Sequence, residues 1–230
     1  MMKNEVVGPD EWRTKRIDLL EKEKAFTKLR DELSEKRRAL PWVRLDKPYS
    51  FNTSEGKKTL AELFGENNQL VVYHFMFGPE NQNPCKMCSF WADNFEGLSA
   101  HLNQRDTSFI AISRGQLEKL ETVKQRMGWT FEWVSSFNSD FNRDFQVTLP
   151  GGEINEYNYK KFELEKDVER PGISVFYKGE DGTVYHTYSC YGRELETFNT
   201  VYRYLDIVPK GRDEAGLPFT MAWVDYHDRY

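Results

Sequence analysis

The sequence predicts an α/β protein in which helices flank a mixed central sheet. Gln69–Phe77 and Thr107–Ser113 are apolar runs bounded by polar turn residues, as in strands that are buried on both faces. An amphipathic helical pattern follows each of these runs. Two later strand-like stretches, Gly172–Tyr177 and Gly182–Ser189, meet at the turn sequence KGEDG, which is a hairpin signal. Strands that alternate with helices form an α/β sheet, and the hairpin makes that sheet mixed.

A long, highly charged helix is predicted over Asp10–Leu40, where Asp10 is placed to cap the first turn and Pro41 to end the helix. Its large apolar residues recur every seven positions and form one narrow stripe: Trp12, Leu19, Phe26, Leu33 and Leu40. A stripe this thin does not stabilise a helix alone. We therefore expect it to pack on its own domain or on a partner chain, as in a homodimer formed through this helix.

The remaining pattern is divided into shorter elements. In chain order they are a strand and turn in 49–58, a capping-box helix at Thr59–Gly65, a helix over Trp91–Leu102, a helix over Leu117–Met127 closed by Gly128, a strand in 129–136 and a last helix over Leu195–Leu205. The polar, aperiodic stretch Leu149–Arg170 predicts an inserted surface loop. We expect an N-terminal helical extension (1–48), a main domain (49–210) with its insert at about 148–170, and a C-terminal tail (211–230) packed on that domain.

Composition excludes several classes of function. The chain has 230 residues, a formal net charge of −5 and a pI near 5.6, which argue against nucleic-acid or membrane partners. No apolar run reaches the roughly 20 residues that span a bilayer. The opening residues, MMKNEVVGPDEWRTKR, lack the apolar segment of a signal peptide, and three cysteines cannot build a disulfide framework. We expect a cytoplasmic protein.

Cys85 and Cys88 form a C-x-x-C pair where a buried strand ends and a helix begins. The free N–H groups of a first helical turn stabilise a thiolate, and the thiolate is the form that attacks. Pro84 suits a helix start, and Lys86 adds a positive charge. We expect Cys85 to be the nucleophile and Cys88 the resolving thiol, with no cofactor.

Two other interpretations of the pair stay open. A tetrahedral zinc site needs four ligands, but Cys190 and the four histidines are widely scattered, so no metal is expected. Alternatively, the cysteines are incidental, and the protein is a non-enzymatic interaction module or a small-molecule-binding module. His74 lies within a strand and is expected to be an ordinary buried histidine. Arg114 and Gly115 follow a buried strand and form a weak candidate anion site.

The order of strand, Cys85-Lys86-Met87-Cys88, helix, strand and helix, followed by ERPGISVFYKGEDGTV, resembles the thioredoxin superfamily. More narrowly, the chain is similar to one bacterial family, catalogued as domain of unknown function number 899 and labelled a predicted dithiol-disulfide oxidoreductase. The motifs that carry this second resemblance are RDELSEKRRALPWVR, VVYHFMFGP, CSFWADNF, SSFNSDFNRDF, GISVFY, HTYS and MAWVDYHDRY.

The resemblance implies a thioredoxin-like fold and exchange with protein or low-molecular-weight thiols and disulfides. It also implies a cis peptide bond at Arg170–Pro171, facing the dithiol. The side chains expected around the substrate groove are those of Pro171, Arg170, Pro84, Lys86 and Trp91. Peroxide-reducing relatives carry Thr or Ser three residues before the reactive cysteine, where this chain has Gln82, so direct peroxidase activity is not expected.

Overall fold

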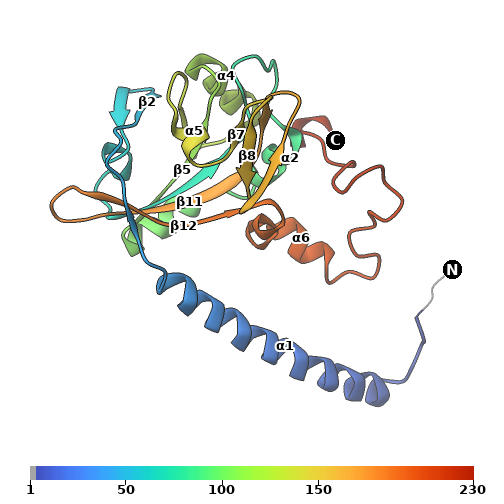
Figure 1. Cartoon of the computed structure of the whole chain (residues 1–230). Helices are drawn as coiled ribbons and strands as arrows, with labels where there is room; N and C mark the ends of the chain where they lie inside the picture. Colours follow the sequence, from blue (N-terminus) through green and yellow to red (C-terminus); the bar gives the residue numbers. More distant parts are fainter. Residues whose placement is uncertain (1–3) are drawn as a thin grey trace. The chain divides into compact units, whose positions relative to one another are not determined.

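The computed structural model describes residues 4–230; residues 1–3, at the start of the predicted N-terminal extension, lie outside the described part. The chain divides into two compact units, one ending at Pro41 and one spanning Trp42–Tyr230. The second unit carries the sheet that the sequence predicts (Figure 1).

The main sheet has eight strands: Val43–Arg44 (β1), Ser50–Thr53 (β2), Gly56–Thr59 (β3), Gln69–His74 (β4), Thr107–Ser113 (β5), Glu132–Ser135 (β6), Gly172–Lys178 (β11) and Val184–Tyr191 (β12). Two small sheets pair Thr148–Leu149 (β7) with Val168–Glu169 (β10), and Ile154–Tyr157 (β8) with Lys160–Glu163 (β9). The α-helices are Pro9–Arg38 (α1), Lys86–Ala92 (α2), Leu98–Leu102 (α3), Leu117–Met127 (α4), Phe141–Asp144 (α5) and Thr200–Leu205 (α6). Short 3-10 turns occupy Glu62–Phe64 (η1), Asn103–Arg105 (η2), Gly192–Phe198 (η3) and His227–Arg229 (η4).

The strand order in the main sheet is β1-β12-β11-β4-β5-β6-β2-β3. β4, β5 and β6 run parallel, whereas β11 runs antiparallel to β4 and β12 runs antiparallel to β11. The sheet is therefore mixed, as predicted. The predicted strands at 69–77, 107–113 and 172–177 all lie in this one sheet, with β4 at its centre.

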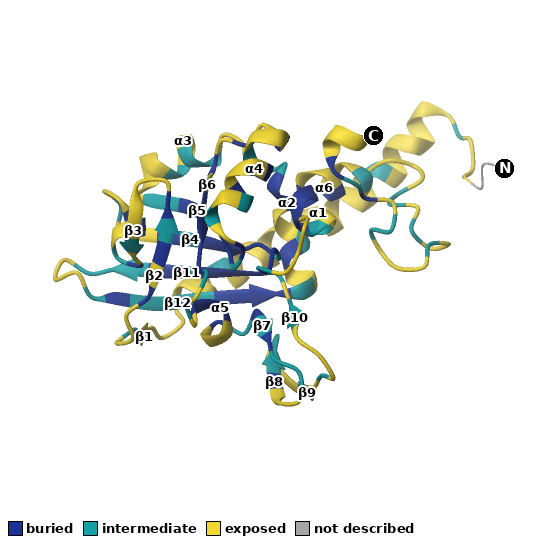
Figure 2. Cartoon of the chain, turned by 90° about the horizontal axis from the view of Figure 1, so that it is seen from above, coloured by how far each residue is buried: buried dark blue, intermediate teal, exposed yellow. Residues whose placement is uncertain are grey.

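Apolar groups cover both faces of the central strands, which is why those strands read as continuous apolar runs. In β4, Leu70 and Val72 belong to one core cluster, and Tyr73 belongs to the cluster on the opposite face, which Phe75 continues beyond the strand's end. Side chains alternate along a strand, so each face receives every second residue. The buried strands form the centre of the unit in Figure 2. The face that holds Tyr73 is the face on which α2 packs.

The capping signals in the sequence are confirmed at two short helices. Around η1, Thr59 N donates to Glu62 Oε2 at 2.7 Å, and Glu62 N donates to Thr59 Oγ1 at 3.3 Å, which is the reciprocal pairing of a capping box. Gly128 ends α4 with a left-handed φ of 66°.

Two predicted helices are interrupted. The helix expected over Trp91–Leu102 ends at Ala92 and restarts at Leu98, after Gly97, the N-cap residue of α3, which adopts a left-handed φ of 79°. The helix expected over Leu195–Leu205 is a 3-10 turn followed by α6. Asn199 separates the two segments and caps α6, since its side chain accepts a hydrogen bond from Tyr202 N. The apolar residues keep a helical spacing across both breaks, so the sequence gives no sign of them.

The stretch predicted as an inserted surface loop, Leu149–Arg170, contains short strands, so the sequence did not reveal its regular structure. β8 and β9 form a hairpin whose two central residues, Asn158 and Tyr159, both have positive φ, of 50° and 61°. Such turns match the twist of a hairpin, and glycine is their usual signal. Tyr159 supplies no such signal, so the sequence conceals the turn.

The first helix starts one residue earlier than predicted. Gly8 is the N-cap residue of α1 and Pro9 occupies its first turn, so Asp10 lies inside the helix and makes no side-chain cap. Proline is favoured at this position because it has no N–H to leave unpaired and a fixed φ. The packing of the apolar stripe of α1, on its own domain or on a partner chain, stays a prediction. Within residues 4–230, no helix combines the length and apolar character that crossing a bilayer requires.

The aromatic core directly beneath the dithiol loop supports a stability prediction. Phe75 is 1% exposed and its ring stacks on that of Trp133 at a centroid distance of 4.5 Å. Replacing Phe75 with Ala should lower the free energy of unfolding by about 3–5 kcal/mol, because it leaves a cavity. Chemical denaturation measures this change. Phe219, which is 59% exposed, provides the matched control, and Phe219→Ala should change stability by less than about 0.5 kcal/mol.

Candidate active site

Cys85 lies at the N-cap position of α2, where its backbone is extended (φ −64°, ψ 125°). Its N–H donates to the carbonyl of Met76 at 3.1 Å, which closes the loop that follows β4. Its own carbonyl accepts hydrogen bonds from both the N–H and the Oγ of Ser89, each at 3.0 Å. The start of α2 is therefore fixed on both sides of the cysteine.

Hydrogen bonding lowers the pKa of the Cys85 thiol to about 7. The largest cause is the hydrogen bond from the Cys88 side chain, and the backbone N–H groups of Cys88 and Met87 act in the same direction, whereas burial opposes them. Lys86 does not contribute as the sequence suggested. Its ammonium forms an ion pair with Asp225 Oδ2 at 3.0 Å, so its charge is already compensated.

Cys88 faces the strand beneath it and is only 2% exposed. The N–H of Met76 points to its Sγ at 3.5 Å. Burial raises the pKa of the Cys88 thiol well above its ordinary range. No disulfide joins it to Cys85 in this structure. The two thiols therefore differ in both access and acidity, and Cys85 is the one that carries a thiolate near neutral pH.

Tyr73 supports Cys88 from below. It belongs to β4, its side chain is 1% exposed, and its hydroxyl hydrogen-bonds to the Cys88 side chain. Burial raises the pKa of Tyr73 well above 10, so the hydroxyl stays protonated and available as a donor. The alternation of β4 explains this position, since Tyr73 points to the face on which α2 packs.

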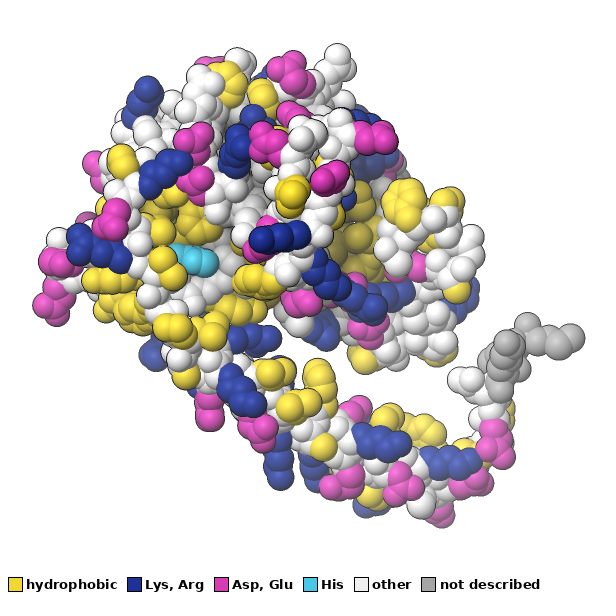
Figure 3. All heavy atoms as spheres, viewed as in Figure 1, with side chains coloured by type: hydrophobic (Ala, Val, Ile, Leu, Met, Phe, Trp, Pro, Cys, Tyr) yellow, Lys and Arg dark blue, Asp and Glu magenta, His cyan; other side chains and the backbone are white. Residues whose placement is uncertain are grey.

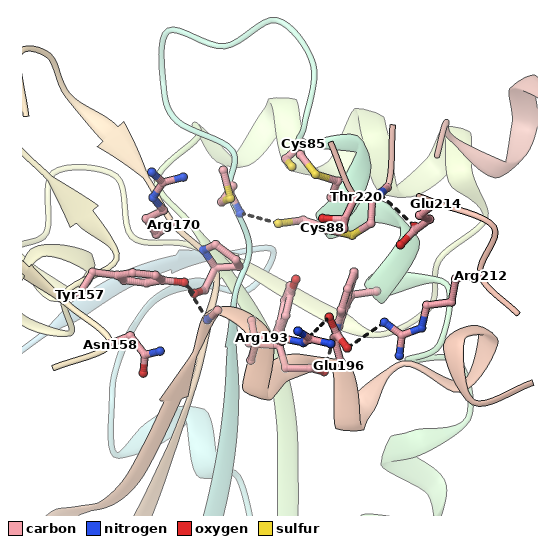
Figure 4. Close-up of a pocket in the computed structure, with 18 of the residues that line it drawn as sticks. Cys85, Cys88, Tyr157, Asn158, Arg170, Arg193, Glu196, Arg212, Glu214 and Thr220 are labelled. Carbon is pink, nitrogen blue, oxygen red and sulfur yellow. Dashed lines mark hydrogen bonds and ion pairs between the residues drawn. The ribbon is translucent and has the colours of Figure 1, made fainter. Parts of the chain in front are cut away.

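The two cysteines open on a cavity of about 1070 Å³. Figure 3 shows a hollow with hydrophobic side chains at depth and charged side chains along its edge. Beside the dithiol the wall is apolar: Met76, Trp91, Leu195 and Met221. The opposite walls come from the β8–β9 hairpin and from the C-terminal tail (Figure 4).

Pro171 lines this cavity, but the Arg170–Pro171 bond is trans, so the expectation of a cis bond is wrong. Neighbouring contacts hold the trans form on both sides. Arg170 N donates to Val147 O at 2.8 Å, and the hydroxyl of Tyr157 donates to Pro171 O at 2.7 Å while accepting from Gly192 N at 2.9 Å. Trans is also the less costly isomer by about 0.5–1 kcal/mol.

The sequence-predicted site residues divide into two groups. Cys85, Cys88, Pro171, Arg170 and Trp91 all line the cavity. Pro84 and Lys86 do not line the cavity. Pro84 is buried and its carbonyl accepts a hydrogen bond from Tyr226 Oη at 2.6 Å, and Lys86 faces Asp225. Both therefore contact the C-terminal tail and not the cavity.

Other candidates from the sequence serve structural roles. His74 is buried and bonds Ser174 Oγ at 2.8 Å through Nε2, and burial lowers its pKa to about 3, so it is neutral. Arg114 pairs with Glu169 at 2.7 Å, which uses the charge that a bound anion would need. Tyr157, the residue that holds Pro171, is not predicted from the sequence. Its only signal is an aromatic residue in a polar insert.

The fold and the cysteine pair define a class. The chain has a thioredoxin-like fold. Its elements follow the order β4, α2, β5, the β11–β12 hairpin and α6, and a C-x-x-C pair lies at the start of α2. The whole chain, residues 1–230, matches the family described as "Bacterial protein of unknown function (DUF899)", and the chain belongs to that family. A search of curated proteins finds no match to this chain.

Several solved structures are similar to this chain at low identity. A mutant of PrxQ from Xylella fastidiosa is 17% identical, with 72% of this chain and 95% of that chain covered and a TM-score of 0.45. The peroxidoxin BcpB from Mycobacterium tuberculosis is 12% identical, with 72% and 97% covered and a TM-score of 0.45. A putative thiol-disulfide oxidoreductase from Bacteroides vulgatus is 14% identical, with 67% and 92% covered and a TM-score of 0.40. Likeness this distant says nothing about the reaction.

The unequal acidity of the two thiols predicts unequal alkylation. The rate at Cys85 should rise with pH through a midpoint at about 7, because only the thiolate attacks and its fraction grows as pH passes the pKa. Cys88 should react far more slowly at every pH near neutrality. Iodoacetamide labelling followed by peptide mass spectrometry measures both rates. A midpoint for Cys85 at the ordinary thiol value of about 8.5 would contradict this expectation.

Removing the Tyr73 hydroxyl tests the support beneath Cys88. In Tyr73→Phe, Cys88 loses a donor that stabilises its thiolate, so disulfide closure from a Cys85 adduct should slow. A hydrogen bond to a charged group contributes about 1.5 kcal/mol, which corresponds to roughly a tenfold slower closure. Stopped-flow release of the second thiol from a model disulfide measures this step. The first step, attack by Cys85, is the internal control and should change much less.

Proposed function

We propose that this protein catalyses thiol–disulfide exchange, with Cys85 as the attacking thiol and Cys88 as the resolving thiol. The observation that carries the proposal is the pairing of a Cys85 thiol of pKa about 7 with a buried second thiol in the lining of the same cavity. A thiol whose pKa is close to the ambient pH combines a large thiolate fraction with high nucleophilicity. Cys85 meets that condition at neutral pH.

The reaction proceeds in two balanced steps. The Cys85 thiolate attacks one sulfur of a disulfide R–S–S–R, forms a mixed disulfide and expels R–S⁻. Cys88 then gives its proton to the first expelled thiolate or to water and attacks Cys85 Sγ, which forms the Cys85–Cys88 disulfide and expels the second R–S⁻. The substrate disulfide gains two electrons and the protein dithiol loses them. A reducing thiol, from a protein or a small molecule, returns the dithiol to its starting state.

The surroundings of the dithiol favour disulfide exchange over direct peroxide reduction. Gln82, at the position where peroxide-reducing relatives carry Thr or Ser, is exposed and does not line the cavity. The cavity wall beside the cysteines consists instead of apolar groups, and sulfur-containing substrates suit such a surface. The proposed substrates are therefore disulfides, and the proposed setting is a reducing cytoplasm.

Single-cysteine variants test the proposal. Cys88→Ser should accumulate a stable mixed disulfide with a model disulfide, because no second thiol remains to release Cys85. Cys85→Ser should abolish exchange. Intact-protein mass spectrometry detects the adduct, and thiol release measures turnover. Cys190→Ser, a change at another buried cysteine outside the cavity, is the matched control and should behave as the wild type.

A different outcome would favour a non-enzymatic module. Wild-type protein that forms no Cys85–Cys88 disulfide under mild oxidant, with equal slow labelling of both thiols, would refute the exchange function. Redox equilibration against mixtures of reduced and oxidised dithiothreitol provides that measurement on the intact chain.

A further inference from the structure

Most charged groups on the cavity wall are already neutralised by neighbours. Arg212 pairs with Glu196 through Nη1 at 2.8 Å and with Asp206 through Nε at 2.7 Å. Glu196 also forms an ion pair with Arg193, whose Nε lies 3.5 Å from Glu196 Oε1. Two of the acidic side chains of the cavity, Glu196 and Asp206, are thereby committed to arginines that line the same cavity.

The third acidic side chain of the cavity, Glu214, holds the C-terminal tail in place. Its Oε1 accepts hydrogen bonds from Tyr202 Oη at 3.0 Å, Met221 N at 2.9 Å and Trp223 Nε1 at 2.7 Å. All three donors are uncharged, so they position the carboxylate without neutralising its charge. Among the described residues that line the cavity, Glu214 is the one acidic side chain without an ion pair, and it lies on the side formed by the tail.

Two basic side chains of the cavity have no such compensation. Across residues 4–230, the side chains of Arg170 and Lys160 are exposed and make no hydrogen bond or ion pair with the protein. Both come from the insert, and the backbone of Arg170 is fixed by its hydrogen bond to Val147 O. In Figure 4, Arg170 and Cys85 both lie in the upper part of the view, Arg170 on the side of Tyr157 and Cys85 at the start of α2. The cavity therefore combines a nucleophilic sulfur with an uncompensated positive charge.

The size and lining of the cavity indicate a small ligand. A volume of about 1070 Å³ is slightly above the range of about 300–1,000 Å³ that is typical of small-molecule sites. The hairpin and the tail wall the dithiol on opposite sides, and the surface beside the sulfurs is apolar. A molecule that fits has an apolar or sulfur-containing centre and an anionic group at its end.

We propose that the cavity binds a low-molecular-weight disulfide that carries carboxylate groups, an inference that rests on the exchange function proposed above. The S–S bond lies at Cys85, and a carboxylate lies at Arg170 and Lys160. Arginine suits this role because its planar guanidinium matches a carboxylate with two parallel hydrogen bonds. In the exchange step Cys85 takes one half of the disulfide, and the other half leaves as a carboxylate-bearing thiolate.

A matched pair of chromogenic disulfides tests the proposal. Dithiobis(nitrobenzoate) carries two carboxylates, whereas dipyridyl disulfide is aromatic and uncharged at neutral pH. The rate at Cys85 is measured with both probes for the wild type, Arg170→Gln and Lys160→Gln. With the dianionic probe each variant should react about two- to fivefold more slowly, as expected for losing one exposed charge contact. With the uncharged probe both variants should match the wild type.

Lys161→Gln is the control for net charge. Lys161 is the next residue of β9, is exposed and does not line the cavity. The substitution removes the same charge from the same strand, so it should leave both rates unchanged. Raising the salt concentration should reduce the wild-type preference for the dianionic probe, because ions screen exposed charges.

The outcomes separate this proposal from the exchange function. Equal losses with both probes, or an equal effect of Lys161→Gln and Lys160→Gln with the dianionic probe, would overturn the carboxylate site and leave the exchange function standing. A wild-type Cys85 that reacts with neither probe would overturn the exchange function itself. A normal rate with the uncharged probe also shows that each variant is correctly folded.

Discussion

The hydrogen bond from the Cys85 N–H to the Met76 carbonyl is the contact on which the site depends. It returns the chain to the end of β4 after the loop that follows that strand, and it places the start of α2 above the strand. From there the two cysteines take different environments: Cys85 faces the cavity, and Cys88 faces Tyr73. The contrast in their acidity follows from this one placement, since it decides which sulfur is buried and which receives the free N–H groups.

The walls around the dithiol are held by polar contacts between segments that are far apart in the sequence. Tyr157, from the β8–β9 hairpin, fixes Pro171 and Gly192 through one hydroxyl. On the opposite side of the cavity, Glu214 accepts three hydrogen bonds that fix the conformation of the tail. Tyr226 then reaches Pro84 at the edge of the dithiol loop. The walls of the cavity therefore depend on long-range hydrogen bonds, whereas β4 and α2, which carry the dithiol, are determined by local sequence.

The sequence predicts well what depends on local pattern. Continuous apolar runs predict β4 and β5, and C-x-x-C at a strand end predicts Cys85 at a helix start. It fails where distant groups decide the outcome. The pairing of Lys86 with Asp225 removes a charge that the local pattern assigns to the thiol, and contacts to Val147 and Tyr157 hold Pro171 trans. The Asn158–Tyr159 turn is missed because a tyrosine stands where glycine is usual.

The origin of the cavity walls has an evolutionary consequence. The sulfurs and the groups that tune them belong to β4 and α2, whereas the unpaired charges belong to the insert and much of the remaining wall belongs to the tail. Surface hairpins and tails tolerate substitution better than buried strands. Ligand preference can therefore diverge between members of the family while the sulfur chemistry stays the same, because the two are encoded by separate parts of one chain.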